Sequence, residues 1–180
     1  MKNSYTLKIA GIVRQLPIIQ ISNHVKIASF VTLGDRELVE KVAPILVEKL
    51  PEVDILVTAE AKGIPLVYEM AKILNMKHYI VARKSIKAYM NEPFLIEVQS
   101  ITTNEKQILC LDQKDVELIK GKKVALIDDV ISTGESIRAL EQLVVKAGAK
   151  VITKAAILAE GDAAKRKDII FLQTIPIFNI

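Results

Sequence analysis

The sequence predicts an α/β fold built on a parallel sheet, and two observations support this prediction. Short β-branched runs alternate along the chain with segments that carry apolar residues at helical spacing. The runs are continuously apolar, as in 123–127 and 151–158, and this is typical of parallel strands that are covered on both faces. We therefore expect helices on both sides of the sheet.

The expected elements can be placed in chain order. An amphipathic helix over 35–50 comes first, with Asp35 as its N-cap. The core then follows as strands and helices in alternation, and Gly148 is the expected C-cap of the last helix. The expected strands are 55–58, 78–82, 123–127 and 151–158, and the expected helices between them are 64–74 and 135–147.

The segment 94–111 departs from this alternation. It alternates loosely between apolar and polar residues and is interrupted by the polar stretch 102–105. We interpret it as a two-stranded antiparallel excursion with a flexible tip, which would close over a site as a lid. Because the chain has no repeat or Gly/Ser linker, we expect one domain over residues 1–180.

Composition indicates an ordinary globular protein and argues against several other classes. The chain has 180 residues, 51% of them hydrophobic, and a formal net charge of +4. Its lysines are spread along the chain, so nucleic-acid binding is not indicated. A single cysteine gives no sign of an oxidising compartment, and no apolar run is long enough to span a bilayer. We expect a cytoplasmic protein without a membrane segment.

The segment 124–136 carries the strongest functional signal. An apolar strand leads to Asp128 and Asp129, and a turn of Ser, Thr and Gly then opens a helix. Ligands bind at the carboxyl ends of parallel strands, and such a turn offers N–H and hydroxyl donors to a phosphate. We expect both acids at the exposed end of the strand, where they could accept hydrogen bonds from a ribose diol.

Two other interpretations apply to this acidic pair. Asp128 and Asp129 could simply end a strand, with Ser132 as an ordinary helix cap. An acidic pair also follows an apolar strand in receiver domains. Receivers carry that pair near the start of the domain, whereas here it lies at position 128 of 180.

The whole string resembles the motif with which type I phosphoribosyltransferases bind 5-phosphoribosyl 1-pyrophosphate (PRPP). In that motif two hydrophobic residues, two acids, two hydrophobic residues and a small Ser/Thr/Gly turn follow in order. The resemblance implies that Asp128 and Asp129 are the catalytic acids, which hold the ribose hydroxyls and Mg²⁺. It also implies that the 5-phosphate is bound by Ser132, Thr133, Gly134, Glu135 and Ser136. Glu135 stands where many relatives have glycine.

Two upstream segments resemble the parts of this family that bind pyrophosphate. The first resembles the pyrophosphate loop and comprises Glu60, Ala61, Lys62 and Gly63. The resemblance implies a cis peptide between the first two of these residues, and Lys62 stands in place of the usual arginine. The second resembles the Arg-Lys-x-x-Lys run of adenine phosphoribosyltransferases and comprises Arg83, Lys84 and Lys87. Taken alone, each would be an unremarkable turn after a strand.

Three features bear on the base. Ile12, Val13 and Arg14 resemble the hood segment that covers the purine in adenine phosphoribosyltransferases. The stretch 159–162 lacks the lysine with which hypoxanthine, guanine and xanthine enzymes read the 6-oxo group, and this favours adenine. Around 101–104, however, the chain lacks the Glu and Tyr of the adenine enzymes and looks nearer to xanthine-type relatives.

The resemblance as a whole implies an enzyme of purine salvage. It would transfer the phosphoribosyl group of PRPP to a purine, most favourably adenine, giving AMP and pyrophosphate with Mg²⁺ as cofactor, and it would form a homodimer. Another purine such as xanthine stays open as the acceptor. The alternative from another class is a PRPP-sensing regulator without turnover, in which a DNA-binding module precedes the core. Only about 54 residues precede the first core strand here, which favours the enzyme.

Overall fold

A computed structural model describes residues 4–99 and 106–179. Its core is a five-stranded sheet in the order β10-β9-β8-β4-β5, in which all neighbouring strands are parallel. The predicted α/β fold with a parallel-sheet core is therefore confirmed. The strands are β4 (Ile55–Ala59), β5 (Ile80–Ala82), β8 (Lys123–Ile131), β9 (Lys150–Glu160) and β10 (Ile169–Ile175).

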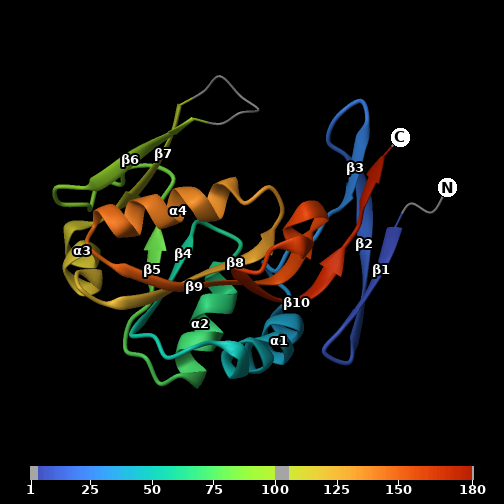
Figure 1. The fold of residues 1–180 in the computed structure, drawn as a ribbon, viewed down its shortest axis with the longest axis horizontal. Helices are drawn as coiled ribbons and strands as arrows, with labels where there is room; N and C mark the ends of the chain where they lie inside the picture. The colour runs from blue at the N-terminus through green and yellow to red at the C-terminus, as the bar shows by residue number, and fades with distance from the viewer. Residues whose placement is uncertain (1–3, 100–105, 180) are drawn as a thin grey trace.

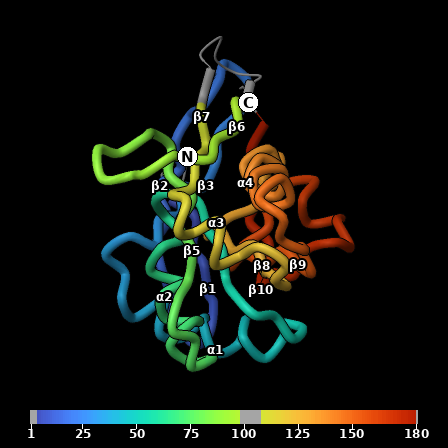
Figure 2. Tube along the Cα trace, turned by 90° about the vertical axis from the view of Figure 1, so that its left-hand side faces the viewer, coloured from blue at the N-terminus to red at the C-terminus, as the bar shows by residue number. Residues whose placement is uncertain are grey.

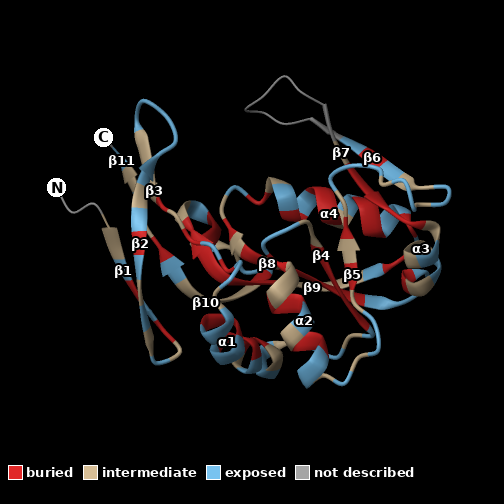
Figure 3. Ribbon diagram, turned by 180° about the vertical axis from the view of Figure 1, so that it is seen from behind, coloured by how far each residue is buried: buried red, intermediate tan, exposed pale blue. Residues whose placement is uncertain are grey.

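Helices cover both faces of this sheet (Figure 1). The helix α4 (Glu135–Lys146) lies above the strands, and α1 (Arg36–Lys49) and α2 (Ile64–Ile73) lie below them, an arrangement that the side view keeps (Figure 2). Successive residues of β8 point to opposite faces, so that Leu126 joins the core on the α4 side and Ile127 joins the core on the α1 and α2 side. Burial on both faces explains why the strands read as unbroken apolar runs (Figure 3).

A second, antiparallel sheet forms the hood at one end of the molecule (Figure 1). Its order is β1-β2-β3-β11, so the first and last strands of the chain form its two edges. Its strands are β1 (Ser4–Ile9), β2 (Ile12–Gln20), β3 (Val25–Ala28) and β11 (Ile177–Asn179). The sequence indicated a hood only at 10–14, and neither β10 nor β11 was predicted.

The predicted antiparallel excursion is also present. It consists of β6 (Phe94–Gln99) and β7 (Lys106–Leu111), which pair in register and lie beside α4. A short helix, α3 (Gln113–Ile119), follows it. Residues 100–105 lie outside the described residues. They include the polar tip 102–105 of the expected lid and the stretch 101–104 that was compared with the adenine enzymes.

The end of strand β8 differs from the prediction, and this changes where the acidic pair lies. The strand β8 extends to Ile131 instead of ending at 127, because Val130 and Ile131 pair with Leu158 and Ala159 of β9. The two acids therefore lie within the strand and not after it. In the part of the chain that the structure describes, no helix is long and apolar enough to cross a membrane.

Candidate functional site

The predicted site residues of the core lie at one edge of the central sheet. Parallel strands bring their carboxyl ends to the same edge, and the loops after β4, β5 and β8 all leave from it. The segments 60–63, 83–87 and 128–136, which are far apart in the sequence, are thereby brought together. Contacts between their side chains define the site.

The acidic pair is divided between two environments because neighbouring residues of a strand point to opposite faces. Asp129 is only 2% exposed, which corrects the expectation that both acids lie at an exposed end. Asp128 is half-buried, and its Oδ1 accepts a hydrogen bond of 2.8 Å from the backbone N–H of Asp129. Burial, followed by the charge of Asp129, raises the pKa of Asp128 to about 7.

The buried acid Asp129 has one cationic partner among the described residues. Nζ of Lys62, in the loop after β4, lies 3.2 Å from Oδ2 of Asp129. That oxygen is buried and takes part in no hydrogen bond within the described residues, so the contact is an ion pair without hydrogen-bond geometry. The oxygen is therefore free to accept a hydrogen bond or to bind a cation.

These carboxylates fit a magnesium ion only in part. Mg²⁺ prefers oxygen ligands and is commonly held by one or two carboxylates together with substrate phosphates and water. Asp128 and Asp129 offer such oxygens, but within the described residues no group of three or more acidic, His or Cys side chains could hold a metal ion. An ion bound here would need the remaining ligands from the substrate and from water.

The loop between β4 and α2 is tightly packed. The peptide bond between Glu60 and Ala61 is cis, as the resemblance predicted. A Cβ atom at Gly63 would lie 2.2 Å from Oγ1 of Thr58, so only glycine fits at this position. The hydroxyl of Thr32 donates a hydrogen bond to the carbonyl of Lys62. These contacts hold the backbone of the loop at the carboxyl end of β4.

Glu60 links this loop to the basic segment at 83–87, after β5, through its side-chain contacts. Its Oε2 accepts a hydrogen bond of 3.0 Å from the backbone N–H of Lys84, and its Oε1 lies 3.3 Å from Nη2 of Arg83. Nε of Arg83 is buried and has no hydrogen-bond partner among the described residues. Lys87 donates a hydrogen bond of 2.5 Å to Oγ of Ser85. Glu60, predicted to bind PRPP, therefore positions cationic residues beside the loop.

The turn between β8 and α4 encloses a small cavity. It measures about 90 Å³ and is lined by Asp128, Ser132, Thr133, Gly134 and Ser136, together with neighbouring apolar residues. Gly134 has a φ of +82°, which side-chain-bearing residues rarely adopt. The N-terminus of α4 begins directly after it and supplies free N–H groups. This cavity suits a phosphate group. The predicted residue Glu135 does not line it.

Arg166 is a neighbour of this turn that the sequence did not reveal. It follows the 3₁₀ helix η1 (Gly161–Lys165). Its Nη1 lies so close to Gly134 that a Cβ atom there would be only 2.4 Å away. Nε and Nη2 of Arg166 donate hydrogen bonds of 2.9 and 2.7 Å to Asp168. No local pattern could have indicated this approach, because it depends on how η1 packs against the turn.

A larger cavity of about 380 Å³ opens next to the turn, where the core meets the hood strand β11. Its lining residues are Ser132, Thr133, Glu160, Asp162, Ala163, Arg166 and Ile177. Its volume is within the range of small-molecule pockets. The side chain of Glu160 is buried at this cavity, with the residue 6% exposed.

The three predicted base-binding residues of β2 are not brought together. Ile12 packs toward the core, whereas Val13 points away from it and is 51% exposed. The Arg14 guanidinium forms an ion pair with Asp35, at 2.7 Å, and another with Glu37, also at 2.7 Å. Arg14 thus links the hood to the start of α1.

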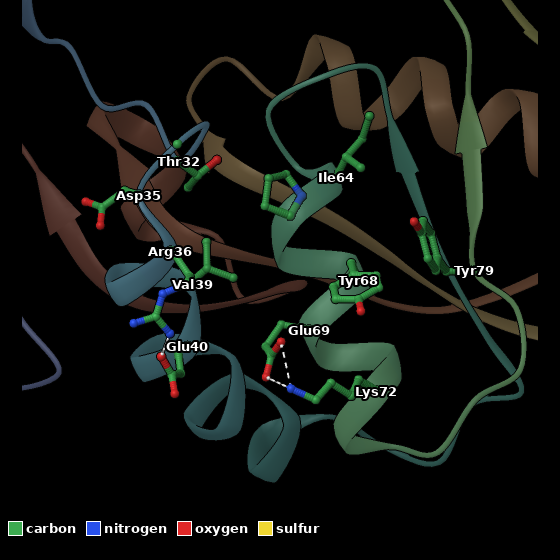
Figure 4. A pocket seen from close by; sticks show the side chains of 12 residues that line it. Thr32, Asp35, Arg36, Val39, Glu40, Ile64, Tyr68, Glu69, Lys72 and Tyr79 are labelled. Atoms are coloured by element: carbon green, nitrogen blue, oxygen red, sulfur yellow. Dashed lines mark hydrogen bonds and ion pairs between the residues drawn. The ribbon is translucent and has the colours of Figure 1, made fainter.

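A further cavity, of about 580 Å³, lies between α1 and α2 (Figure 4). Thr32 and Ile64 stand at one end of it and Lys72 at the other. Tyr68 and Tyr79 contact each other edge to face on its wall, with ring centroids 6.3 Å apart. None of the predicted site residues lines this cavity, so the chemistry is better placed at the sheet edge.

Comparisons with known proteins identify the family of the chain. A family model described as the phosphoribosyl transferase domain matches residues 35–180. A hypoxanthine/guanine phosphoribosyltransferase from Methanocaldococcus sp. (strain FS406-22) is 33% identical over 141 residues, covering 77% of this chain and 68% of that protein. An adenine phosphoribosyltransferase from Thermosipho africanus is 34% identical over 123 residues, covering 67% and 68%.

Solved structures agree on the fold. The crystal structure of an adenine phosphoribosyltransferase from Thermoanaerobacter pseudethanolicus superposes with a TM-score of 0.71. The superposition covers 88% of this chain and 95% of that chain, at 20% sequence identity. At this identity the likeness supports the architecture of core and hood and does not bear on the base.

Proposed function

The chain belongs to the phosphoribosyl transferase family and is a purine phosphoribosyltransferase; on that premise, we propose that its acceptor is adenine, which is converted to AMP with release of pyrophosphate. Relatives named for adenine and for hypoxanthine and guanine both match the sequence, so their names do not favour one base. The observation that carries the proposal is the cavity beside the turn at 132–134, here called the phosphate turn. Its charged lining residues are Glu160, Asp162 and Arg166, and no lysine of the described residues lines it.

We assign PRPP to the edge of the sheet. The 5-phosphate would lie in the small cavity at the N-terminus of α4, and its charge would be favoured by the helix dipole and by the nearby Arg166. The ribose hydroxyls would donate hydrogen bonds to Asp128 and Asp129. The pyrophosphate would then lie over the loop that carries Lys62, beside the basic segment at 83–87.

In the reaction, the bond between the anomeric carbon and pyrophosphate breaks as the base nitrogen attacks. Positive charge develops on the ribose ring, and the carboxylates of Asp128 and Asp129 would stabilise it. Negative charge develops on the leaving pyrophosphate, and Lys62 and Arg83 would stabilise that charge. Mg²⁺ bound with PRPP would supply further positive charge to the pyrophosphate.

Three further expectations are part of the proposal and await their own tests. They are a homodimer, a single domain over residues 1–180 and a cytoplasmic location. Sedimentation of the full chain would measure the first, and limited proteolysis of the same chain would measure the second.

Turnover with competing bases tests the acceptor. PRPP, Mg²⁺ and an equimolar mixture of adenine, hypoxanthine, guanine, xanthine, uracil and orotate would be incubated with the protein, and each product nucleotide would be quantified. We expect AMP to form fastest. A preference for a 6-oxopurine would contradict adenine as the acceptor but would leave the assignment of the PRPP site unchanged. PRPP binding without any turnover would favour the PRPP-sensing regulator.

A further inference from the structure

We propose that Glu160 determines base specificity by accepting a hydrogen bond from an amino group of the purine. Three observations lead to this residue. It is 6% exposed, it lines the 380 Å³ cavity beside the phosphate turn, and it has no hydrogen-bond or ion-pair partner among the described residues. The inference rests on the proposed function in one respect, namely that the base occupies this cavity.

The position of Glu160 is fixed by its backbone. It is the last residue of β9 and pairs in register with Ile175 of β10. The preceding residue, Ala159, pairs with Ile131 of β8. Ser132, the first residue of the phosphate turn, is therefore next to Glu160 across the sheet edge. A base joined to a ribose whose phosphate occupies the turn would reach this carboxylate.

The hood closes the other side of the cavity. Gly161 has a φ of +58°, and a Cβ atom on it would lie 2.4 Å from Cδ1 of Ile177. Glycine therefore allows Ile177 of β11 to pack against the end of β9. The result is an apolar wall next to a buried carboxylate, which suits the flat face and one polar edge of a purine ring.

The other charged residues of the cavity already have partners. Asp162 is highly exposed and lies 2.7 Å from Nζ of Lys165, and Arg166 binds Asp168. Glu160 differs from them because it is both buried and unpaired within the described residues. A carboxylate in such a confined and unpaired position gains a charge-assisted hydrogen bond from a ligand that supplies a donor, so such a ligand is favoured.

A carboxylate would favour the edge of a base that carries a hydrogen-bond donor. Its oxygens only accept hydrogen bonds when it is ionised. The 6-amino group of adenine donates, whereas the 6-oxo group of hypoxanthine accepts and would be repelled. A site built to bind a donor rejects an analogue that lacks it, because the buried group of the site is then left unpaired. Glu160 should therefore favour AMP over inosine monophosphate (IMP).

Equilibrium binding of product nucleotides tests this without turnover. Calorimetry would measure the affinities of the protein for AMP, IMP, guanosine monophosphate (GMP), ribose 5-phosphate and purine riboside 5′-monophosphate. The last nucleotide has no amino group on its base. We expect the wild-type protein to bind AMP about tenfold or more tightly than either IMP or the purine riboside nucleotide. Similar affinities for AMP, GMP and the purine riboside nucleotide would overturn the proposal with the wild-type protein alone.

Variants assign the effect to the residue. Glu160→Ala and the nearly isosteric Glu160→Gln should each reduce the preference for AMP over IMP to about twofold, with ribose 5-phosphate affinity unchanged. Asp162→Asn, which changes an exposed carboxylate of the same cavity, should keep the wild-type ratio. A ratio that survives in a folded Glu160 variant would refute the role of Glu160.

The same measurements separate this inference from the proposed function. A wild-type protein that binds neither ribose 5-phosphate nor any of the nucleotides would contradict both. A preference for GMP over IMP that disappears in Glu160→Ala would reject adenine, and it would support Glu160 as the acceptor for the 2-amino group.

Discussion

Nζ of Lys62 lies 3.2 Å from Oδ2 of Asp129, and this ion pair joins the loop after β4 to the acidic end of β8. The lysine is about half exposed, whereas the aspartate is almost fully buried. A buried carboxylate depends on its counter-charge more than an exposed one does. The loop proposed to bind the pyrophosphate of PRPP is therefore coupled to the strand end proposed to bind its ribose.

We expect Lys62→Gln to weaken PRPP binding by about tenfold to a hundredfold, because one charge-assisted contact to pyrophosphate contributes about 1.5 to 3 kcal/mol. Calorimetric titration with Mg²⁺ and PRPP would measure it. Lys72→Gln, which removes a lysine of α2 that is paired with Glu69, is the matched control and should bind as the wild type does. Equal affinities for wild type and Lys62→Gln would show that Lys62 serves only Asp129.

The double variant Asp128→Asn, Asp129→Asn should lose measurable PRPP binding while it remains folded. Asparagine keeps the volume of each side chain, and at position 128 it keeps an oxygen that accepts the N–H of Asp129. Both carboxylates that would hold the ribose hydroxyls and Mg²⁺ are removed. Thermal unfolding would verify the fold, and calorimetry would measure the affinity. Unchanged affinity in the folded variant would contradict the assignment.

Gly63→Ala should disrupt the loop after β4, and Thr58→Ala should partly restore it. The added Cβ would lie 2.2 Å from Oγ1 of Thr58, but 3.4 Å from the carbonyl of Ile127, which is ordinary contact. We expect the single variant to lose about 1 to 3 kcal/mol of stability through overpacking. Urea unfolding of both single variants and the double variant would measure the coupling. Strictly additive effects would mean that another contact causes the clash.

Much of the core could be predicted from the sequence because burial leaves a strong periodic signal. The runs at 55–58 and 123–127 became β4 and β8, and Asp35 caps α1 by accepting a hydrogen bond of 3.1 Å from the N–H of Leu38. The hood was largely missed. Its strand β2 is mostly half-buried or exposed, so its pattern is weak, and β11 pairs with β3 from the other end of the chain.

In the site, too, local features could be predicted from the sequence and contacts between distant segments could not. Residues within one short string, such as Asp128 and Gly134, could be recognised together because the chain itself keeps them close. Contacts between distant segments had no local signal: Arg166 approaches Gly134, and Glu160 meets the hood at Ile177, only through tertiary packing. The ion pair between Arg14 and Asp35 at the start of α1 likewise could not be predicted from the residues around Arg14.

The ion pair between Arg14 and Asp35 should make stability depend on pH. The Arg14 guanidinium, which donates hydrogen bonds of 2.7 and 2.9 Å, holds the pKa of Asp35 below its ordinary value. An acid whose pKa is lowered on folding stabilises the protein above its unfolded pKa of about 4, and this stabilisation is lost as the pH falls through the folded pKa.

Asp35→Asn should therefore lower the free energy of unfolding by about 1 kcal/mol at pH 7, after a discount for solvent screening, and the difference should shrink below about pH 4. Asparagine is also a good N-cap, so this variant isolates the charge. Asp35→Ala removes the cap as well and should cost about 1 kcal/mol more at either pH. Denaturant titrations at pH 7 and pH 3 would measure both. A pH-independent difference for Asp35→Asn would exclude the ion pair as its cause.

The contact of Arg166 with the phosphate turn predicts a selective loss of affinity. Its Nη1 approaches Gly134, while Nε and Nη2 are held by Asp168, so one end of the guanidinium remains directed at the turn. A positive charge there favours a phosphate dianion. We expect Arg166→Gln to weaken ribose 5-phosphate binding by about tenfold and to leave pyrophosphate binding unchanged, because pyrophosphate would bind near Lys62.

The neighbouring Lys165 provides the matched control for Arg166. It lies in η1 and is exposed, and its Nζ pairs with Asp162 at 2.7 Å. Lys165→Gln removes the same charge one residue away but should leave both affinities as in the wild type. Calorimetry with each ligand, at two salt concentrations, would separate a local contact from a general effect of net charge, because a general effect is screened by salt and would appear in both variants. Equal losses in the two variants, or a loss of pyrophosphate affinity in Arg166→Gln, would contradict a specific role for Arg166 at the phosphate turn.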